Sequence, residues 1–150
     1  MVKRTSHKDV ACGVARPLDA IGDSWSLLIV RDAFEGSRRF GEFQRSLGMA
    51  KNILAARLRH LVEHGIFEAV APEDGGAHLE YQLTEKGRGM FVLLTALRQW
   101  GEDYFFEPGE AHVHLVDRKR GQPVRRLELV AQDGRRLTPE DTMVNRDGVD

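Results

Sequence analysis

Basic side chains gather in one short stretch of the chain. Between Gly36 and His60 the sequence holds six arginines and lysines but a single acidic residue, Glu42. This clustering favours contact with the phosphates of nucleic acid, because a purely solvated helix would mix the two charge signs more evenly. The net charge of the whole chain is only −1, so any surface for a polyanion must be local. The basic residues are Arg38, Arg39, Arg45, Lys51, Arg57 and Arg59.

Part of this stretch has the pattern of an amphipathic helix whose polar face could read DNA. Leu54, Leu58 and Leu61 recur at helical spacing and predict a stripe that packs inward. On the polar face, asparagine can pair with adenine and arginine with guanine, while small alanines let a helix sit deep in the major groove. Arg57 lies beside the apolar stripe, where its partner would be a phosphate or an internal carboxylate. We expect phosphate contacts from Arg38, Arg39, Lys51 and Arg57, base contacts from Asn52, Arg59 and His60, and close approach at Ala55 and Ala56.

Four helical segments are expected to position these side chains. The second is almost wholly apolar and therefore central, and Asp23 or Ser24 can cap its start. Gly48 and Gly65 are placed to end the third and fourth helices in the left-handed conformation. The four predicted helices cover residues 14–21, the run WSLLIVRDAF, residues 40–47 and residues 50–64.

A hairpin and a long helix are predicted to follow. Residues 67–71 and 78–83 alternate like strands around the turn-rich PEDGGA, which predicts an antiparallel hairpin. Thr84 can cap a long helix to Tyr104, whose apolar band is wide enough for the core and for the same helix of a second subunit. After Pro108, alternating runs separated by glycine turns predict a small β unit.

This order of elements is the plan of a winged helix-turn-helix domain. The expected fold class is α+β and mainly α, with dimerisation helices flanking the DNA-binding domain. We expect a winged helix-turn-helix DNA-binding and dimerisation domain over residues 1–106. Residues 107–150 would form a small β-rich C-terminal extension with a polar tail.

Three stretches resemble the HxlR-type family of bacterial transcription regulators, which is related to the MarR group. They are CGVARPLDAIGDSWSLLIVRDAF, GSRRFGEFQRSLGMAKNILAARLRHLVEHGI and LEYQLTEKGRGM, and the match spans residues 12–105. The resemblance implies a homodimer that pairs through its N-terminal and long C-terminal helices and regulates transcription from a near-palindromic operator. It also implies control by oxidation of a cysteine matching Cys12 in some members, and by small-molecule effectors in others.

Two regions depart from that family. Glu73 and Asp74 stand at the hairpin tip, where acidic groups repel phosphate and disfavour a close wing contact, so His78 is the nearest candidate donor. The extension resembles a ribbon that in some relatives holds zinc through cysteine pairs. Here the single cysteine, Cys12, excludes such a thiolate site and an internal disulfide.

Several further residues have two interpretations. Cys12 is either an inert thiol at a helix start or a redox sensor. Trp25 and Trp100 are core or dimer-interface residues, or they line an effector pocket. Glu110, His112 and His114 invite a metal interpretation because two histidines at i and i+2 share a strand face. Without an identified further ligand, no metal site is predicted.

The remaining features limit the class of protein. No glycine-rich phosphate loop, GxSxG, HExxH or paired-carboxylate site is present, so we expect no enzyme and no cofactor. The polar, basic start and the lack of a long apolar run predict a cytoplasmic protein with no membrane partner. Two alternatives to a DNA-binding regulator are a small-molecule sensor whose DNA binding is secondary or lost, and a protein-interaction module on the same fold.

Overall fold

The computed structural model describes residues 5–149, so residues 1–4 of the basic start and residue 150 of the polar tail lie outside it. The chain divides into two compact units, Met1–Phe91 and Val92–Asp150, and each is described by itself. Among the described residues, no helix is both long enough and apolar enough to cross a membrane.

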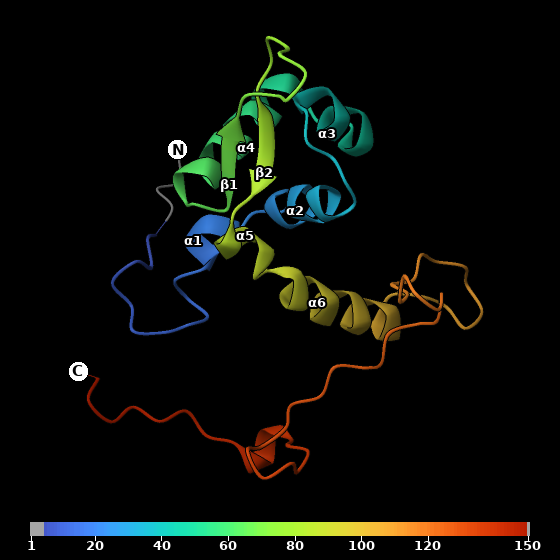
Figure 1. The fold of residues 1–150 in the computed structure, drawn as a ribbon. Coiled ribbons are helices and arrows are strands. Elements are labelled where there is room, and N and C mark those ends of the chain that lie inside the picture. Colours follow the sequence, from blue (N-terminus) through green and yellow to red (C-terminus); the bar gives the residue numbers. More distant parts are fainter. Residues whose placement is uncertain (1–4, 150) are drawn as a thin grey trace. The chain divides into compact units, whose positions relative to one another are not determined.

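The first unit contains the four expected helices (Figure 1). Their bounds are Leu18–Ile21 for α1, Ser26–Phe34 for α2, Phe40–Leu47 for α3 and Lys51–Glu63 for α4. Gly48 and Gly65 follow α3 and α4 with φ values of 64° and 72°, which confirms their role as left-handed stops. The core between these helices is formed by side chains that are fully buried, namely Ile29, Val30, Phe43, Leu54, Leu58 and Leu61.

The prediction for the first helix was too long. α1 begins at Leu18, and Val14 lies before it with 74% of its surface exposed. Pro17 stands at the start of α1, where its carbonyl accepts the first helical hydrogen bonds, from the amides of Ala20 and Ile21. Proline is favoured at a helix start and disfavoured inside one, so the turns before Pro17 do not continue the helix.

Asp23 rather than Ser24 accepts the hydrogen bonds at the start of α2. Its Oδ1 accepts from the amides of Trp25 and Ser26 at 2.8 and 2.9 Å. Burial raises the pKa of Asp23, but the hydrogen bonds from the Ser26 hydroxyl and from these amides outweigh it and lower the pKa overall. The carboxylate therefore stays charged where the exposed amides of the helix favour an anion.

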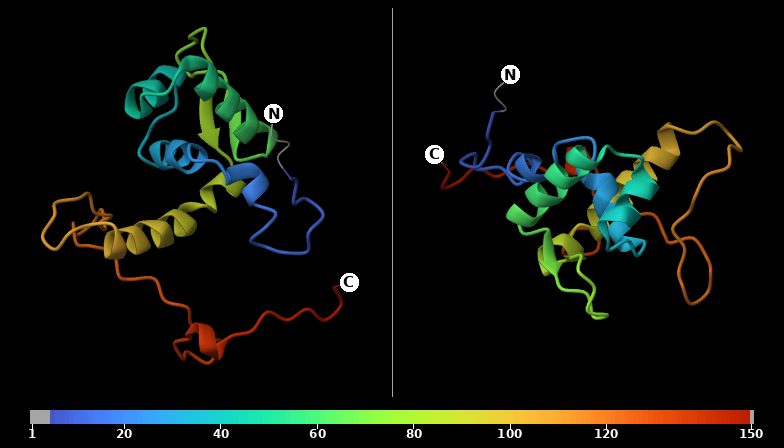
Figure 2. Two further views of the ribbon diagram at one scale, coloured as in Figure 1. Left: turned by 180° about the vertical axis from the view of Figure 1, so that it is seen from behind. Right: turned by 90° about the horizontal axis from the view of Figure 1, so that it is seen from above.

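The expected hairpin forms the wing. Strands β1 (Phe67–Val70) and β2 (Glu80–Leu83) pair antiparallel, with Phe67 opposite Leu83. The chain entering α3 lies along β2, because the Tyr81 amide donates to the Arg38 carbonyl at 2.8 Å. Figure 2 shows α2, α3 and α4 grouped around this hairpin from two further sides.

A single long helix from Thr84 to Tyr104 was wrong, because the structure has two helices, α5 (Glu85–Arg88) and α6 (Phe91–Tyr104). Thr84 caps α5 as expected, its Oγ1 accepting from the amide of Gly87. Gly87 lies so close to the residue that precedes β1 that an added Cβ would stand 2.2 Å from the carbonyl oxygen of Ile66. Only glycine fits at this close approach, and α5 ends at a second glycine, Gly89, a residue type of low helix propensity.

The second unit contains α6 and the C-terminal extension. The two predicted turns form, and Gly121 and Gly134 adopt positive φ values of 66° and 89°. Each turn closes a single isolated bridge, Val116 with Pro123 and Val130 with Arg136, and the described residues after 107 add only the short 3₁₀ helix η1 (Pro139–Asp141). The expected β-rich extension is thus reduced to bridges, because its mostly exposed side chains provide no apolar face to hold longer strands together.

Candidate nucleic-acid interface

One face of α4 is exposed and the other is buried, as the sequence pattern predicts. Leu54, Leu58 and Leu61 are fully buried in the first unit. On the opposite face Lys51, Asn52, Ala56 and Arg59 are exposed, and Ala55 is half-buried. The helix therefore presents a hydrogen-bonding amide, a guanidinium and small side chains on one surface, which is the chemistry that reads base edges in a major groove.

Of the two partners expected for Arg57, a phosphate or an internal carboxylate, the structure shows the carboxylate. Its Nη1 lies 3.3 Å from Oδ2 of Asp23, and the Arg57 side chain is 27% exposed. This ion pair connects α4 to the start of α2. The phosphate contact expected of Arg57 would have to compete with it.

The imidazole of His60 is hydrogen-bonded within the fold. Its Nε2 lies 3.0 Å from the carbonyl oxygen of Asp19 and 3.1 Å from that of Ala20. Carbonyl oxygens only accept, so Nε2 donates and fastens α4 to α1. The ring also packs against His64 at a centroid distance of 4.3 Å. The base contact expected of His60 would therefore have to compete with a contact within the fold.

Two acidic residues of the wing bind the arginines before α3. Arg39 lies 2.8 Å from Oδ2 of Asp74 and 3.2 Å from Oε1 of Glu80, and Arg38 lies 3.9 Å from Glu80. The hydrogen bond from Arg39 lowers the pKa of Asp74. The hydrogen bonds that Arg39 donates to Asp74 and Glu80 raise the pKa of Arg39. The acidic hairpin tip is thereby partly neutralised, and both arginines remain about half exposed.

Glu42, the lone acid of the basic stretch, acts at the start of α3. Its Oε2 accepts from the backbone amides of Arg38 and Arg39 at 2.7 and 2.9 Å. These two hydrogen bonds lower the pKa of Glu42. Glu42 thus orders the backbone that carries both arginines, and its charge sits at a helix N-terminus.

Comparison with known proteins matches residues 20–108 to the family described as HxlR-like helix-turn-helix. The chain belongs to this HxlR-like family. It is a transcriptional regulator with a helix-turn-helix domain and not an enzyme, and a regulator of this kind acts on DNA.

Individual HxlR-like relatives and related structures agree with this assignment. The HTH-type transcriptional regulator Rv3095 of Mycobacterium tuberculosis is 43% identical over 107 residues, covering 71% of this chain and 68% of the relative. A crystal structure of PA1607, a candidate transcription factor, is 68% identical with a TM-score of 0.92 and covers 95% of this chain and 100% of that one. The redox regulator HypR, in its reduced form, is 30% identical with a TM-score of 0.56, covering 61% and 92%.

The other predicted residues of this HxlR-like chain are dispersed. His78 is exposed beside the hairpin tip, and Cys12 is exposed in the segment before α1. Trp25 is half-buried at the start of α2 in the first unit, while Trp100 belongs to α6 in the second and is 53% exposed.

Sequence reasoning missed the partners that hold the interface in place. Asp19, Asp74 and Glu80 lie far from the basic helix along the chain, and their contacts depend on the folded arrangement. Only the wing contacts had a signal in the sequence. The hairpin is rich in acidic residues, and two adjacent arginines precede the third predicted helix.

Proposed function

We propose that this protein binds DNA sequence-specifically, as a homodimer on a near-palindromic operator in the cytoplasm. The observation that carries the proposal is the exposed face of α4, where Asn52 and Arg59 lie beside Ala56. Within residues 5–149, no hydrogen bond or ion pair engages the side chains of Asn52 and Arg59. Both are therefore available to base edges, Asn52 to adenine and Arg59 to guanine.

Phosphate contacts are assigned to the basic side chains around this face. Lys51 is exposed at the start of α4, and Arg38 and Arg39 remain half exposed beside the wing. Arg57 contributes mainly through its ion pair with Asp23, which orients α4 for insertion. Phosphate contacts fix the register of the helix, while Asn52 and Arg59 select the sequence.

The dimer proposal rests on the apolar side chains of α6 and of the residues just after it. In a helix of 14 residues, so many exposed large apolar groups are unusual for a monomer in water. A second copy of α6 would cover them symmetrically and place two α4 helices in successive major grooves, about 34 Å apart. The exposed residues are Phe91, Val92, Leu93, Leu97, Trp100, Tyr104, Phe105 and Phe106.

Control by thiol oxidation is the second part of the proposal. Cys12 is exposed in the segment before α1, where a 2.6 Å hydrogen bond from Nε of Arg16 to the Val10 carbonyl closes a turn around it. Oxidation requires a thiol that the oxidant can reach, and the exposure of Cys12 meets this requirement. The similar protein HypR is a redox regulator, which supports testing the same chemistry here. Control by a small-molecule effector is the alternative, and ligand-induced changes in tryptophan fluorescence would reveal it.

The decisive experiment is a fluorescence-anisotropy titration of the full chain with DNA from upstream of its own gene and with a scrambled duplex, at several salt concentrations. We expect a salt-dependent preference for the upstream DNA. If a selection from random duplexes also yielded no preferred sequence, the proposal would be overturned. A thiol oxidant should release the DNA from the natural chain but not from Cys12→Ser, and release from both would contradict the thiol mechanism.

A further inference from the structure

Two histidines of the extension meet a carboxylate of α6 inside the second unit. Glu102, His112 and His114 each offer a ligand atom, and these three atoms all lie within 4.8 Å of one another. The imidazole rings of His112 and His114 have their centroids 4.2 Å apart. Two elements of one unit therefore bring two ring nitrogens and a carboxylate oxygen to the same point.

The acidic member of this cluster is not the one that the sequence suggests. Glu110 is nearer to the histidines along the chain, but its Oε2 accepts from the amide of Glu107 at 2.8 Å, so it closes a local turn. Glu102 instead comes from α6. Within residues 5–149, no hydrogen bond or ion pair engages its carboxylate.

The tautomer of His112 is fixed by its surroundings. Its Nδ1 lies 3.1 Å from the carbonyl oxygen of Glu110, and because a carbonyl only accepts, Nδ1 carries the hydrogen. Nε2 is then the nitrogen with an available lone pair. A hydrogen bond from the second ring nitrogen to a carbonyl is the usual device that orients a metal-binding histidine.

We propose that Glu102, His112 and His114 bind a divalent transition metal ion, with zinc as the best match. Two imidazoles and one carboxylate are a recurrent protein ligand set for zinc, with water in the fourth position. Ring nitrogens select zinc, nickel or copper over magnesium and calcium, which prefer oxygen ligands. No thiolate is needed, so the site is compatible with a chain that has a single cysteine.

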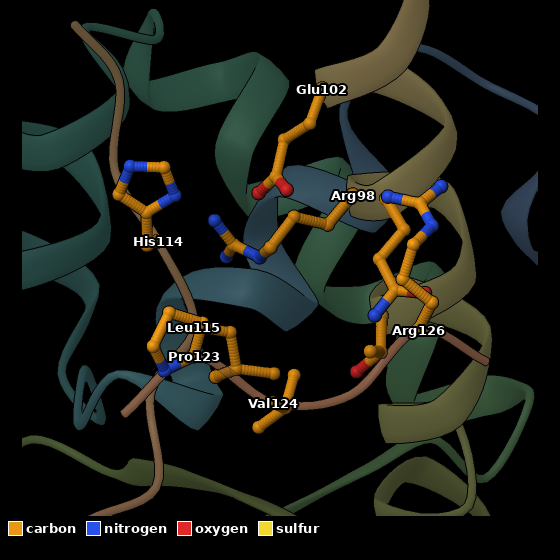
Figure 3. Close-up of a pocket in the computed structure, with 9 residues that line it drawn as sticks. Arg98, Glu102, His114, Leu115, Pro123, Val124 and Arg126 are labelled. Carbon is orange, nitrogen blue, oxygen red and sulfur yellow. The ribbon is translucent and has the colours of Figure 1, made fainter. Parts of the chain in front are cut away.

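A cavity of about 220 Å³ adjoins the cluster, and its charged lining bears on the affinity of the cluster for a metal ion. Figure 3 shows Glu102 and His114 on the border of this cavity, with the guanidinium of Arg98 near both. Arg126, which is paired with Asp103, also lines the cavity. A cationic side chain close to the ligands opposes a second cation, so the site should bind zinc more weakly than a four-ligand structural site.

A bound ion would join the extension to α6. Glu102 and His112 are separated by about ten residues, so the ion would close a short loop. Because the three ligands converge only in the folded unit, binding should stabilise the folded chain. We expect the thermal unfolding temperature to rise with added zinc, independently of DNA.

The test uses the full chain with Cys12→Ser, which removes the exposed thiol as a competing ligand. Zinc is titrated against a chromophoric chelator, and we expect one ion per chain. Glu102→Gln, His112→Ala and His114→Ala should each weaken zinc binding by at least about tenfold and abolish the thermal shift. Glu110→Gln and His78→Ala are matched controls, since they remove a nearby carboxylate and another exposed imidazole but keep the three ligands and the Glu110 carbonyl that holds His112.

Three outcomes would overturn the site. The first is the absence of stoichiometric zinc binding by the parent chain. The second is unchanged zinc affinity in a chain that carries Glu102→Gln, His112→Ala and His114→Ala together. The third is a loss in Glu110→Gln that equals the loss in Glu102→Gln. The Glu102→Gln substitution is nearly isosteric at a half-buried position, so its effect can be measured on a folded protein, as circular dichroism of the metal-free chain will confirm.

Discussion

Arg57 of α4 and Asp23, which caps α2, form an ion pair with Nη1 and Oδ2 3.3 Å apart. One carboxylate thus fixes both the start of the central helix and the basic face of the helix assigned to DNA. The pair is largely shielded from solvent, with side-chain exposures of 27% and 17%. Loss of this ion pair is therefore expected to lower both the stability of the protein and its affinity for DNA.

Asp23→Ala should lower the free energy of unfolding by about 1–3 kcal/mol, because it removes a helix cap and leaves Arg57 without its partner. The pKa of Asp23 is lowered by folding, so its contribution is complete above the unfolded pKa of about 3.9 and is lost as pH falls through the folded pKa. Urea unfolding at pH 7 and near pH 3 measures both effects. A variant as stable as the parent at pH 7 would contradict this role.

Arg59 and Lys51 are expected to fail in different ways when replaced by alanine. Arg59→Ala should cost about 1–3 kcal/mol on the operator and relax discrimination at one position per half-site. Lys51→Ala should weaken binding to every duplex and reduce the salt slope by about one. Anisotropy titrations over a panel of operator variants separate the two. Equal weakening on all DNA by Arg59→Ala would refute base reading by that residue.

His60→Ala distinguishes a contact within the fold from a contact with a base. The imidazole donates from α4 to carbonyl oxygens of α1, so its loss should reduce stability by about 1 kcal/mol. Discrimination between operator variants should remain as in the parent. Thermal unfolding and the same DNA panel provide the measurement, and relaxed discrimination at unchanged stability would restore His60 as a base reader.

Asp74→Asn should tighten binding to all DNA and increase its salt dependence. The substitution removes a negative charge at the wing and the 2.8 Å ion pair of Arg39 with Asp74, while the 3.2 Å pair of Arg39 with Glu80 remains. Asp133→Asn is the matched control, because Asp133 forms a comparable exposed pair with Arg135 at 2.9 Å in the second unit. If Asp74→Asn instead weakened binding while the control did not, the pair would serve to position Arg39.

The helices of the first unit were predictable because their signals are local. α3 was predicted at its observed bounds, Phe40–Leu47, since the apolar period and the glycine stop lie within the segment itself. The break between α5 and α6 was not predicted, because the apolar period of the segment continues through Gly89, where α5 ends. The requirement for glycine at Gly87 is likewise not local, since it comes from the carbonyl of Ile66, some twenty residues earlier.

The candidate site divides in the same way. The exposure of Asn52 and Arg59 follows from helical periodicity around Leu58. The contacts of His60 with α1 and of Arg39 with Asp74 do not, because they join residues 41 and 35 positions apart. The same limit explains why Glu102 was missed as a partner of the two histidines, whereas Glu110 was considered on sequence proximity.

The exposed apolar surface of α6 gives the remaining prediction, which concerns assembly. Trp100→Asp places a charge within this surface, where dimerisation would bury it without a partner, at a cost of several kcal/mol. We expect the variant to sediment as a monomer and to lose operator affinity by more than tenfold, because only one α4 helix then reaches the DNA.

Met143→Asp is the control for this substitution, since Met143 is 86% exposed in the extension and lies outside α6. It should leave both the sedimentation coefficient and the operator affinity unchanged. A dimeric Trp100→Asp variant with parental affinity would mean that α6 is not the dimer interface. A monomeric parent chain that nevertheless discriminates its operator would contradict the homodimer proposal while leaving base reading by α4 intact.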